Sequence, residues 1–235
     1  MHTNNIICLG DGFATGHIWP EWPQIIRALM PDYNITTISG IGAGAEFLVS
    51  EMLTLTDIEG AHVIFQWPML NRLDKLLEDN TWDTLIKQDQ VYKENFVDAK
   101  TGRWWLSSAS KLEPVRQYHK FFIQEKQSKL RQEVYKKLVT SFLRDNHCNF
   151  IFTSTPEQDE FSRQKRFASL RQAEVQPSPL VHYKFATEIL LPGLGVTPND
   201  LISSKLENII LSTKWTPYHP DREYIWSTIL NQLTV

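Results

Sequence analysis

The sequence predicts an α/β protein with a parallel sheet of about five strands and helices on both faces. Short apolar runs rich in β-branched residues alternate with stretches in which apolar residues recur at helical spacing. Glycine-containing loops follow the first two apolar runs, as is usual where a strand leads into a helix. The length of 235 residues suits one such domain over 1–235.

The first third of the chain establishes the alternation of strands and helices. Asn5–Leu9 is a short apolar run that ends at a glycine, which predicts a buried strand. Pro23 suits the first turn of a helix, and Pro31 ends that helix. The next predicted elements are a strand over 34–39, a helix over 46–55 and a strand over 61–66.

The segment 73–146 departs from this order and predicts a helical, aromatic-rich insertion within the domain. Ser110 to Glu113 form a capping box with Pro114 directly behind it, so a long helix is expected from there to Leu143. Residues 51–98 hold ten acids and four bases, whereas 111–137 hold eight bases and three acids. Most such runs are solvated helix faces, and a basic stripe for an anionic ligand is the alternative.

The last part of the chain returns to the α/β pattern. A strand is expected over 149–154, then a polar surface segment over 157–178 and a helix over 183–191. The short apolar run 206–211 fits a strand or a helix. A closing helix is expected over 221–233.

Composition and charge exclude several classes of protein. The net charge of −3 gives no overall basic field for nucleic acid or an anionic membrane. Cys8 and Cys148 lie in apolar runs and are interpreted as buried thiols in a reducing compartment. Neither a leader peptide nor a membrane-spanning run is recognisable. We therefore expect a cytoplasmic protein, and the spacing of its histidines and acids predicts neither a metal site nor a cofactor.

A dinucleotide site is the first possibility for the loop after the first strand. Gly10, Gly12 and Gly16 follow that strand, but their spacing is one residue longer than the usual fingerprint. Trp19-Pro20 and Trp22-Pro23 delay the helix that should face a pyrophosphate, and the second strand ends in Ser39-Gly40 without an acid for the ribose. These departures argue against a dinucleotide site.

Four loops carry short blocks that resemble the SGNH/GDSL hydrolase family. Gly10-Asp11-Gly12 follows the first strand, where that family has Gly-Asp-Ser with the nucleophile. Gly40 and Gly42 follow the second strand, where a backbone N–H helps to form the oxyanion hole. Asn71 stands after the third strand, where an Asn completes the hole, and His219 precedes the last helix, where the family has its base. The resemblance implies a flavodoxin-like order of strands, with 73–146 inserted.

Two positions depart from the family's pattern. Gly12 replaces the nucleophilic serine and Thr216 replaces the triad acid, so the first block has no hydroxyl to acylate. Ser39 is a substitute nucleophile, although a serine at a strand end is more often a turn residue. Asp11 is either a base or a residue that bonds the turn backbone.

Other side chains near the strand ends are candidates for ligand contacts. His17 and Trp67 would face the same rim, where Trp67 would wall a cleft unless it packs in the core. His182 is a second candidate base that precedes a helix.

Two functions follow from these residues and from the resemblance. The first is binding of an acyl, ester or sugar-like ligand at the carboxyl ends of the strands, with ester or acyl hydrolysis or transfer as the chemistry. The alternative is a catalytically degenerate binding or assembly module on the same scaffold, of the kind a virus or phage carries. Loss of the serine and of the acid favours this alternative. The expected partner is a small-molecule or glycan-like ligand; the oligomeric state stays open.

Overall fold

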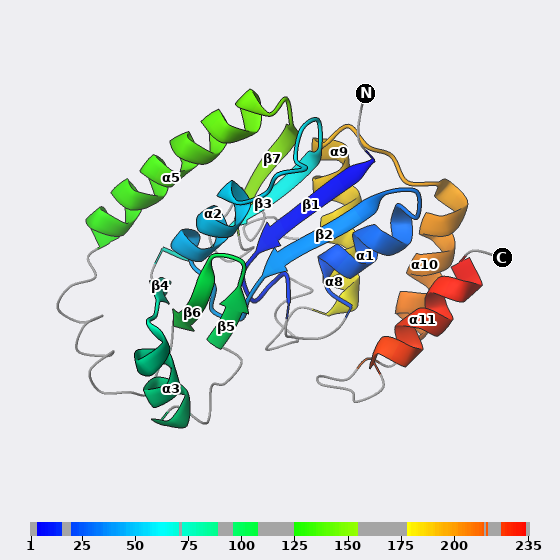
Figure 1. The fold of residues 1–235 in the computed structure, drawn as a ribbon. Coiled ribbons are helices and arrows are strands. Elements are labelled where there is room, and N and C mark those ends of the chain that lie inside the picture. The colour runs from blue at the N-terminus through cyan, green and yellow to red at the C-terminus, as the bar shows by residue number, and fades with distance from the viewer. Residues whose placement is uncertain are drawn as a thin grey trace.

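A four-stranded parallel sheet forms the centre of the protein, with strands in the order β2-β1-β3-β7 (Figure 1). The computed structural model describes residues 4–15, 20–70, 72–88, 96–107, 125–154, 178–213, 215 and 222–233. The strands are β1 (Asn5–Gly10), β2 (Asn34–Ser39), β3 (His62–Trp67) and β7 (Asn149–Ser154). Helices cover both faces, so the prediction of an α/β protein with a parallel sheet is confirmed.

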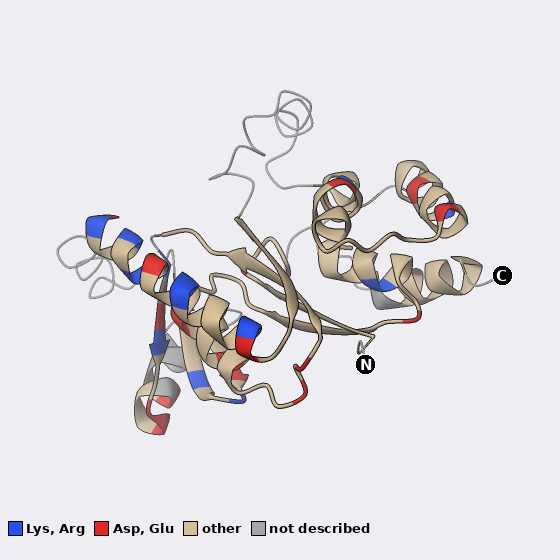
Figure 2. Cartoon of the chain, turned by 90° about the horizontal axis from the view of Figure 1, so that it is seen from above, with Lys and Arg blue, Asp and Glu red and all other residues tan. Residues whose placement is uncertain are grey.

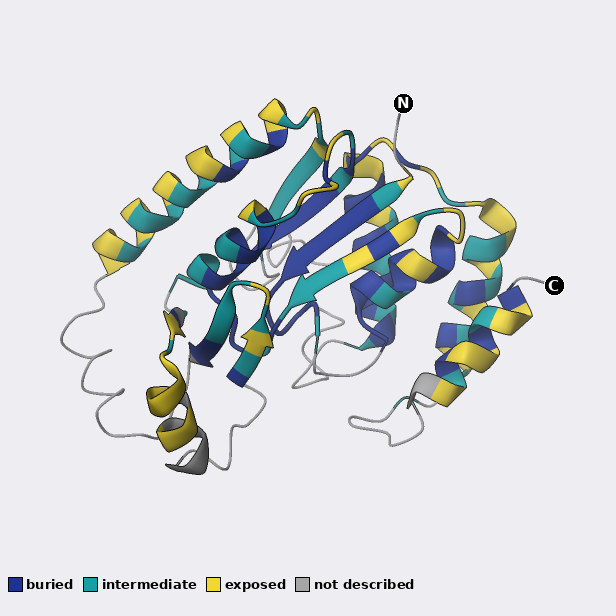
Figure 3. Ribbon diagram, in the orientation of Figure 1, coloured by how far each residue is buried: buried dark blue, intermediate teal, exposed yellow. Residues whose placement is uncertain are grey.

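Alternate residues of the strands enter two separate apolar clusters, one on each face of the sheet. Ile6 and Cys8 of β1 belong to the first cluster, whereas Ile7 and Leu9 belong to the second. Because both faces are buried, β1 reads as a continuous apolar run (Figure 3). Burial raises the pKa of the Cys8 thiol well above its usual range, which keeps this thiol protonated.

The first face of the sheet is covered by helices from both ends of the chain. These are α1 (Trp22–Leu29), α8 (Pro179–Phe185), the π-helical turn η2 (Ala186–Leu190), α9 (Leu191–Gly193), α10 (Asp200–Ser212) and α11 (Arg222–Leu233). The rings of Trp22 and Phe185 meet edge to face at 6.3 Å and pack α1 against α8. Apolar contact therefore joins these helices into one layer.

The second face is covered by α2 (Ala45–Leu53) and α5 (Glu125–Asp145). Phe47 and Leu48 of α2 are buried on this face. The 21-residue α5 contributes only Val139 and Leu143 as buried residues. In Figure 1 the N-terminal half of α5 extends past the layer that α2 forms.

The insertion contains a second sheet, which the sequence analysis did not predict. Its antiparallel strands are β4 (Leu73–Leu76), β6 (Gly102–Ser107) and β5 (Phe96–Ala99), and α3 (Asp79–Gln88) follows β4. The insertion expected to be helical and aromatic-rich over 73–146 thus holds strands as well as helices. The sheet forms because cross-strand pairs such as Phe96 with Trp105 and Val97 with Trp104 bury their aromatic rings.

Two buried carboxylates attach this second sheet to α2. Asp74 of β4 accepts hydrogen bonds from the backbone N–H groups of Gly44 and Phe47, at the N-terminus of α2. Glu51 of α2 accepts from the backbone N–H groups of Lys100 and Thr101, in the turn between β5 and β6. Each carboxylate satisfies two donors that would otherwise lack helix or sheet partners.

Other predicted elements agree with the structure or are corrected by it. The prediction of about five parallel strands is too high for the described residues, which hold four. The run 206–211 lies inside α10, which begins where Asn199 Oδ1 accepts from Leu201 N and Ile202 N. The predicted start of the long helix and the polar segment after β7 lie outside the described residues. Within the described ranges, no helix has the length and apolar character needed to span a membrane.

Candidate functional site

The order of strands reverses between β1 and β3, which points to the carboxyl ends of these two strands. From β1 the chain moves to β2 on one side of the sheet, and it then crosses to β3 on the other side. Ligands of open parallel sheets bind outside the carboxyl ends of the strands at such a reversal. Asp11 and Gly12 follow β1 at this place, and Pro68 follows β3.

The Asp11 carboxylate is buried and binds the surrounding protein. Asp11 Oδ1 accepts from Phe13 N at 3.0 Å and from Gln66 Nε2 at 3.1 Å. Gln66 Oε1 in turn accepts from Trp22 Nε1 at 3.2 Å. Asp11 therefore holds the turn after β1 and connects it to β3 and to α1. Of the two roles considered for Asp11, these contacts favour the turn-bonding role.

Gly12 lies in a buried turn between Asp11 and Phe13. Beside this turn the Phe13 ring packs against the imidazole of His182, with 4.5 Å between the ring centroids. His182 is fully buried at the N-terminal part of α8. The structure thus brings His182, the second candidate base, near the first block.

The loop after β2 is packed beneath the insertion. A Cβ at Gly40 would collide with Leu106 Cδ1 of β6, and Leu106 is fully buried. Gly42 adopts a φ of 85°, a left-handed conformation that favours glycine. Ser39 is the last residue of β2 and is half-buried. The loop that the resemblance assigns to the oxyanion hole is thus closed on one side by an aliphatic side chain.

Trp67 lies in the second apolar cluster, at the end of β3. Its ring packs on Phe65 and Phe152, and the Lys136 ammonium lies 5.9 Å above it. Its Nε1 is buried and has no hydrogen-bond partner among the described residues. These contacts are those of a core residue. Asn71, His17, His219 and Thr216 lie outside the described residues, so the structure does not bear on their predicted roles.

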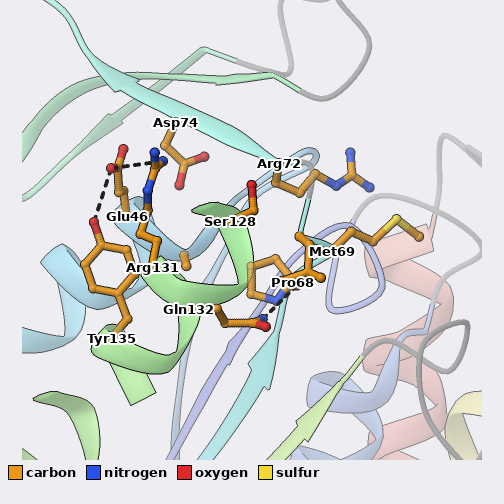
Figure 4. A pocket seen from close by; sticks show the side chains of 11 residues that line it. Glu46, Pro68, Met69, Arg72, Asp74, Ser128, Arg131, Gln132 and Tyr135 are labelled. Atoms are coloured by element: carbon orange, nitrogen blue, oxygen red, sulfur yellow. Dashed lines mark hydrogen bonds and ion pairs between the residues drawn. The ribbon is translucent and has the colours of Figure 1, made fainter. Parts of the chain in front are cut away.

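A polar pocket lies beside this edge of the sheet, between α2, the loop after β3, β4 and α5 (Figure 4). Its lining residues are Ala45, Glu46, Pro68, Met69, Leu70, Arg72, Asp74, Ser128, Arg131, Gln132 and Tyr135. Its volume of about 30 Å³ exceeds the ~10–15 Å³ that one water molecule needs on the same measure. The pocket can therefore receive a small polar group such as a hydroxyl.

Glu46 is the centre of the bonded groups in this pocket. Arg131 Nη1 lies 3.5 Å from Glu46 Oε1, and Tyr135 Oη donates to the same oxygen at 3.2 Å. Gln132 Nε2 donates to the Pro68 carbonyl at 3.4 Å, which joins α5 to the loop after β3. Burial, together with the adjacent Glu46 carboxylate, raises the pKa of Tyr135 to about 12. Tyr135 is thus a donor at neutral pH.

Asp74 closes the inner side of the pocket. Burial raises its pKa to about 7, although the N–H groups of Phe47 and Gly44 and the charge of Arg72 act in the opposite direction. Desolvation outweighs these contacts because the side chain is almost wholly removed from water. Asp74 therefore changes its protonation state close to neutral pH.

Sequence reasoning missed this pocket because its polar residues come from three distant segments. Glu46, Asp74 and Arg131 point toward one another from α2, β4 and α5 in Figure 4. The one local signal is the spacing of Arg131 and Tyr135, which lie one turn apart on the same side of α5. Among the described residues, no group of three or more His, Cys, Asp or Glu side chains is placed to hold a metal ion.

Comparisons of the chain with protein-family models, with curated proteins and with solved structures find no match.

Proposed function

We propose that this protein is a non-hydrolytic, SGNH-like binding module that holds a sugar-like ligand at the carboxyl edge of its parallel sheet. The strand order β2-β1-β3-β7 is compatible with the flavodoxin-like arrangement that the resemblance implies. The ligand would lie over the polar pocket and insert a hydroxyl group between Glu46, Arg131 and Asp74.

The observation that carries the proposal is that the first block, Gly10-Asp11-Gly12, lacks a nucleophile. Gly12 has no side chain, and the Asp11 carboxylate is bonded to Phe13 N and Gln66 Nε2. Acyl transfer through a covalent intermediate needs a nucleophile with an adjacent base. The block Gly10-Asp11-Gly12 offers no hydroxyl or thiol, and Leu106 packs against the Gly40 loop. These contacts support binding without turnover.

The lining of the polar pocket supports a sugar-like ligand over an acyl chain. Carboxylate, guanidinium, amide and phenol groups stand together in it, and they supply the donors and acceptors that hydroxyl groups need. Pro68 and Met69 add a small apolar surface that suits the C–H groups of a sugar ring. An acyl chain needs a deep apolar cavity, whereas the lining of this pocket is mostly polar.

The experiment is a titration of the protein with a panel of methyl glycosides and, separately, with octanoate, followed by ligand-observed NMR and calorimetry. At least one glycoside should bind, and Arg131→Gln should weaken that binding at least tenfold. Lys129→Gln is the matched control because Lys129 is also on α5 and also pairs with an acid, Glu125, at 2.5 Å outside the pocket. This variant should bind as the parent does.

Three results would refute the proposal: no glycoside binds, Arg131→Gln binds as tightly as the parent, or octanoate alone binds. Circular dichroism of each variant, compared with the parent, would establish that the fold is retained.

A further inference from the structure

The outer side of α5 carries an exposed apolar stripe. Leu130, Val134 and Leu138 are 67%, 55% and 44% exposed. They follow one another at intervals of four residues, which places them on one face of the helix. Val139 and Leu143 lie on the opposite side and are buried against the sheet. Figure 3 shows α5 as mostly exposed or half-buried, in contrast to α2.

Such a stripe is costly to leave in water. Full burial of one aliphatic side chain is worth about 1.5–3 kcal/mol. No residue of α5 before Val139 is buried, although Arg131, Gln132 and Tyr135 contact other elements through their polar groups. The N-terminal half of α5 therefore gains most if another apolar surface covers it.

A line of cations runs along one flank of the stripe. Lys126, Lys137 and Arg144 are separated by eleven and seven residues, close to three and two helical turns, so they share one line on α5. All three are exposed, and none pairs with a carboxylate in the described part of the chain. The other α5 cations Lys129, Arg131 and Lys136 pair with Glu125, Glu46 and Glu133. Figure 2 shows the basic residues along α5.

We infer that the outer face of α5 docks an amphipathic helix of a partner protein, with acidic residues beside its apolar side chains. The partner's apolar face would cover Leu130, Val134 and Leu138, and its acids would meet the cation line of Lys126, Lys137 and Arg144. Charges of opposite sign at the rim select the partner and set the direction of docking. This inference does not depend on the proposed ligand in the polar pocket.

Charge argues against a second copy of this chain as the occupant. Two antiparallel α5 helices would bring the two cation lines against each other, because equal flanks face each other in that arrangement. Two parallel α5 helices would bring each cation line beside the flank that carries Arg131.

The experiment measures binding of two designed helical peptides of about 20 residues by fluorescence anisotropy. Both carry leucine at helical spacing; one has glutamate at the flanking positions and the other has glutamine. The protein should bind the glutamate peptide at least tenfold more tightly, and salt should weaken this binding.

Two triple variants separate the two parts of the surface. Leu130→Gln/Val134→Gln/Leu138→Gln should weaken binding of the glutamate peptide at least tenfold. Lys126→Gln/Lys137→Gln/Arg144→Gln should reduce its affinity to that of the glutamine peptide. Because all six side chains are exposed, both variants should keep the parent's circular dichroism spectrum. Lys129→Gln, off the cation line, is the control and should bind as the parent does.

Several results would overturn the inference. Equal affinity for the two peptides, or binding of neither, would exclude an acidic helix. Self-association in sedimentation that the Leu130/Val134/Leu138 variant abolishes would assign the face to a second copy. Binding to phosphatidylserine vesicles that the same variant abolishes would assign it to a membrane.

Discussion

The two faces of the parallel sheet are built by different means. On the first face, helices from both ends of the chain pack around Trp22 and Phe185. On the second face, α2 and half of α5 cover the strands, and buried carboxylates attach the insertion to α2. The polar pocket and the exposed stripe both belong to this second side. The comparison indicates that the first face provides stability and that the second face carries the surfaces available for binding.

The largest expected effect comes from the core of the first face. Trp22 is fully buried, packs on Phe185 and donates to Gln66. Trp22→Ala should lower the free energy of unfolding by about 3–5 kcal/mol because it leaves a cavity and removes the donor to Gln66. Urea unfolding measures this loss. Tyr224→Ala, at a side chain 75% exposed, should change stability by less than about 0.5 kcal/mol. Similar losses in both variants would show that Trp22 does not lie in a closely packed core.

The contact between the insertion and the loop after β2 should rank second. Leu106→Ala removes the side chain that packs against Gly40, and it should cost about 2–3 kcal/mol in urea unfolding. Because Leu106 belongs to the second apolar cluster, unfolding should remain a single transition. A separate early transition for the insertion would show that it is not part of the second face.

The third prediction concerns pH. The pKa of Asp74 rises from 3.8 to about 7 on folding, so the folded state holds this proton more tightly. Asp74 therefore contributes stability that is fully present below about pH 4 and is lost as the pH rises through about 7.

The measurement is urea unfolding of the parent and of Asp74→Asn, which does not titrate, at about pH 4.5 and about pH 8. The advantage of the parent over Asp74→Asn should shrink by more than about 1 kcal/mol at the higher pH, since one pKa unit corresponds to about 1.4 kcal/mol. A constant or growing advantage would mean that Asp74 is not desolvated as described.

The smallest effect is expected at a helix cap on the first face. Asn199→Ala removes the acceptor for Leu201 N and Ile202 N at the start of α10, and it should cost about 1 kcal/mol. Asn199→Asp retains the acceptor and should restore most of this loss in the same thermal unfolding assay. If both variants lose equally, the cap does not support this layer.

The parallel sheet was largely predictable from the sequence, because its strands are short apolar or β-branched runs. The runs 34–39 and 149–154 coincide with β2 and β7. The second sheet was harder to predict because its strands are short and Trp104 and Trp105 are adjacent, which hides the alternation of buried and exposed residues. The available sequence signal was Gly102, which begins β6 with a φ of 129° directly after the turn at residues 100–101.

The candidate site was only partly predictable. The resemblance directed attention to the strand ends, and Asp11 and Gly12 do lie where the strand order reverses. The pocket beside them depends on Asp74 reaching the N-terminus of α2 and on Arg131 reaching Glu46. Such tertiary contacts leave no periodic pattern in the sequence, since each residue also fits an exposed position of its own element.

The central claim is binding without hydrolysis. Its most direct test is the time course of p-nitrophenyl acetate cleavage, at a protein concentration high enough for a stoichiometric burst to be detected. The parent should show no burst and no rate above that of buffer, because the turn after β1 presents Gly12 and a bonded Asp11. A burst of p-nitrophenol equal to the protein concentration, abolished in His219→Ala, would contradict the central claim.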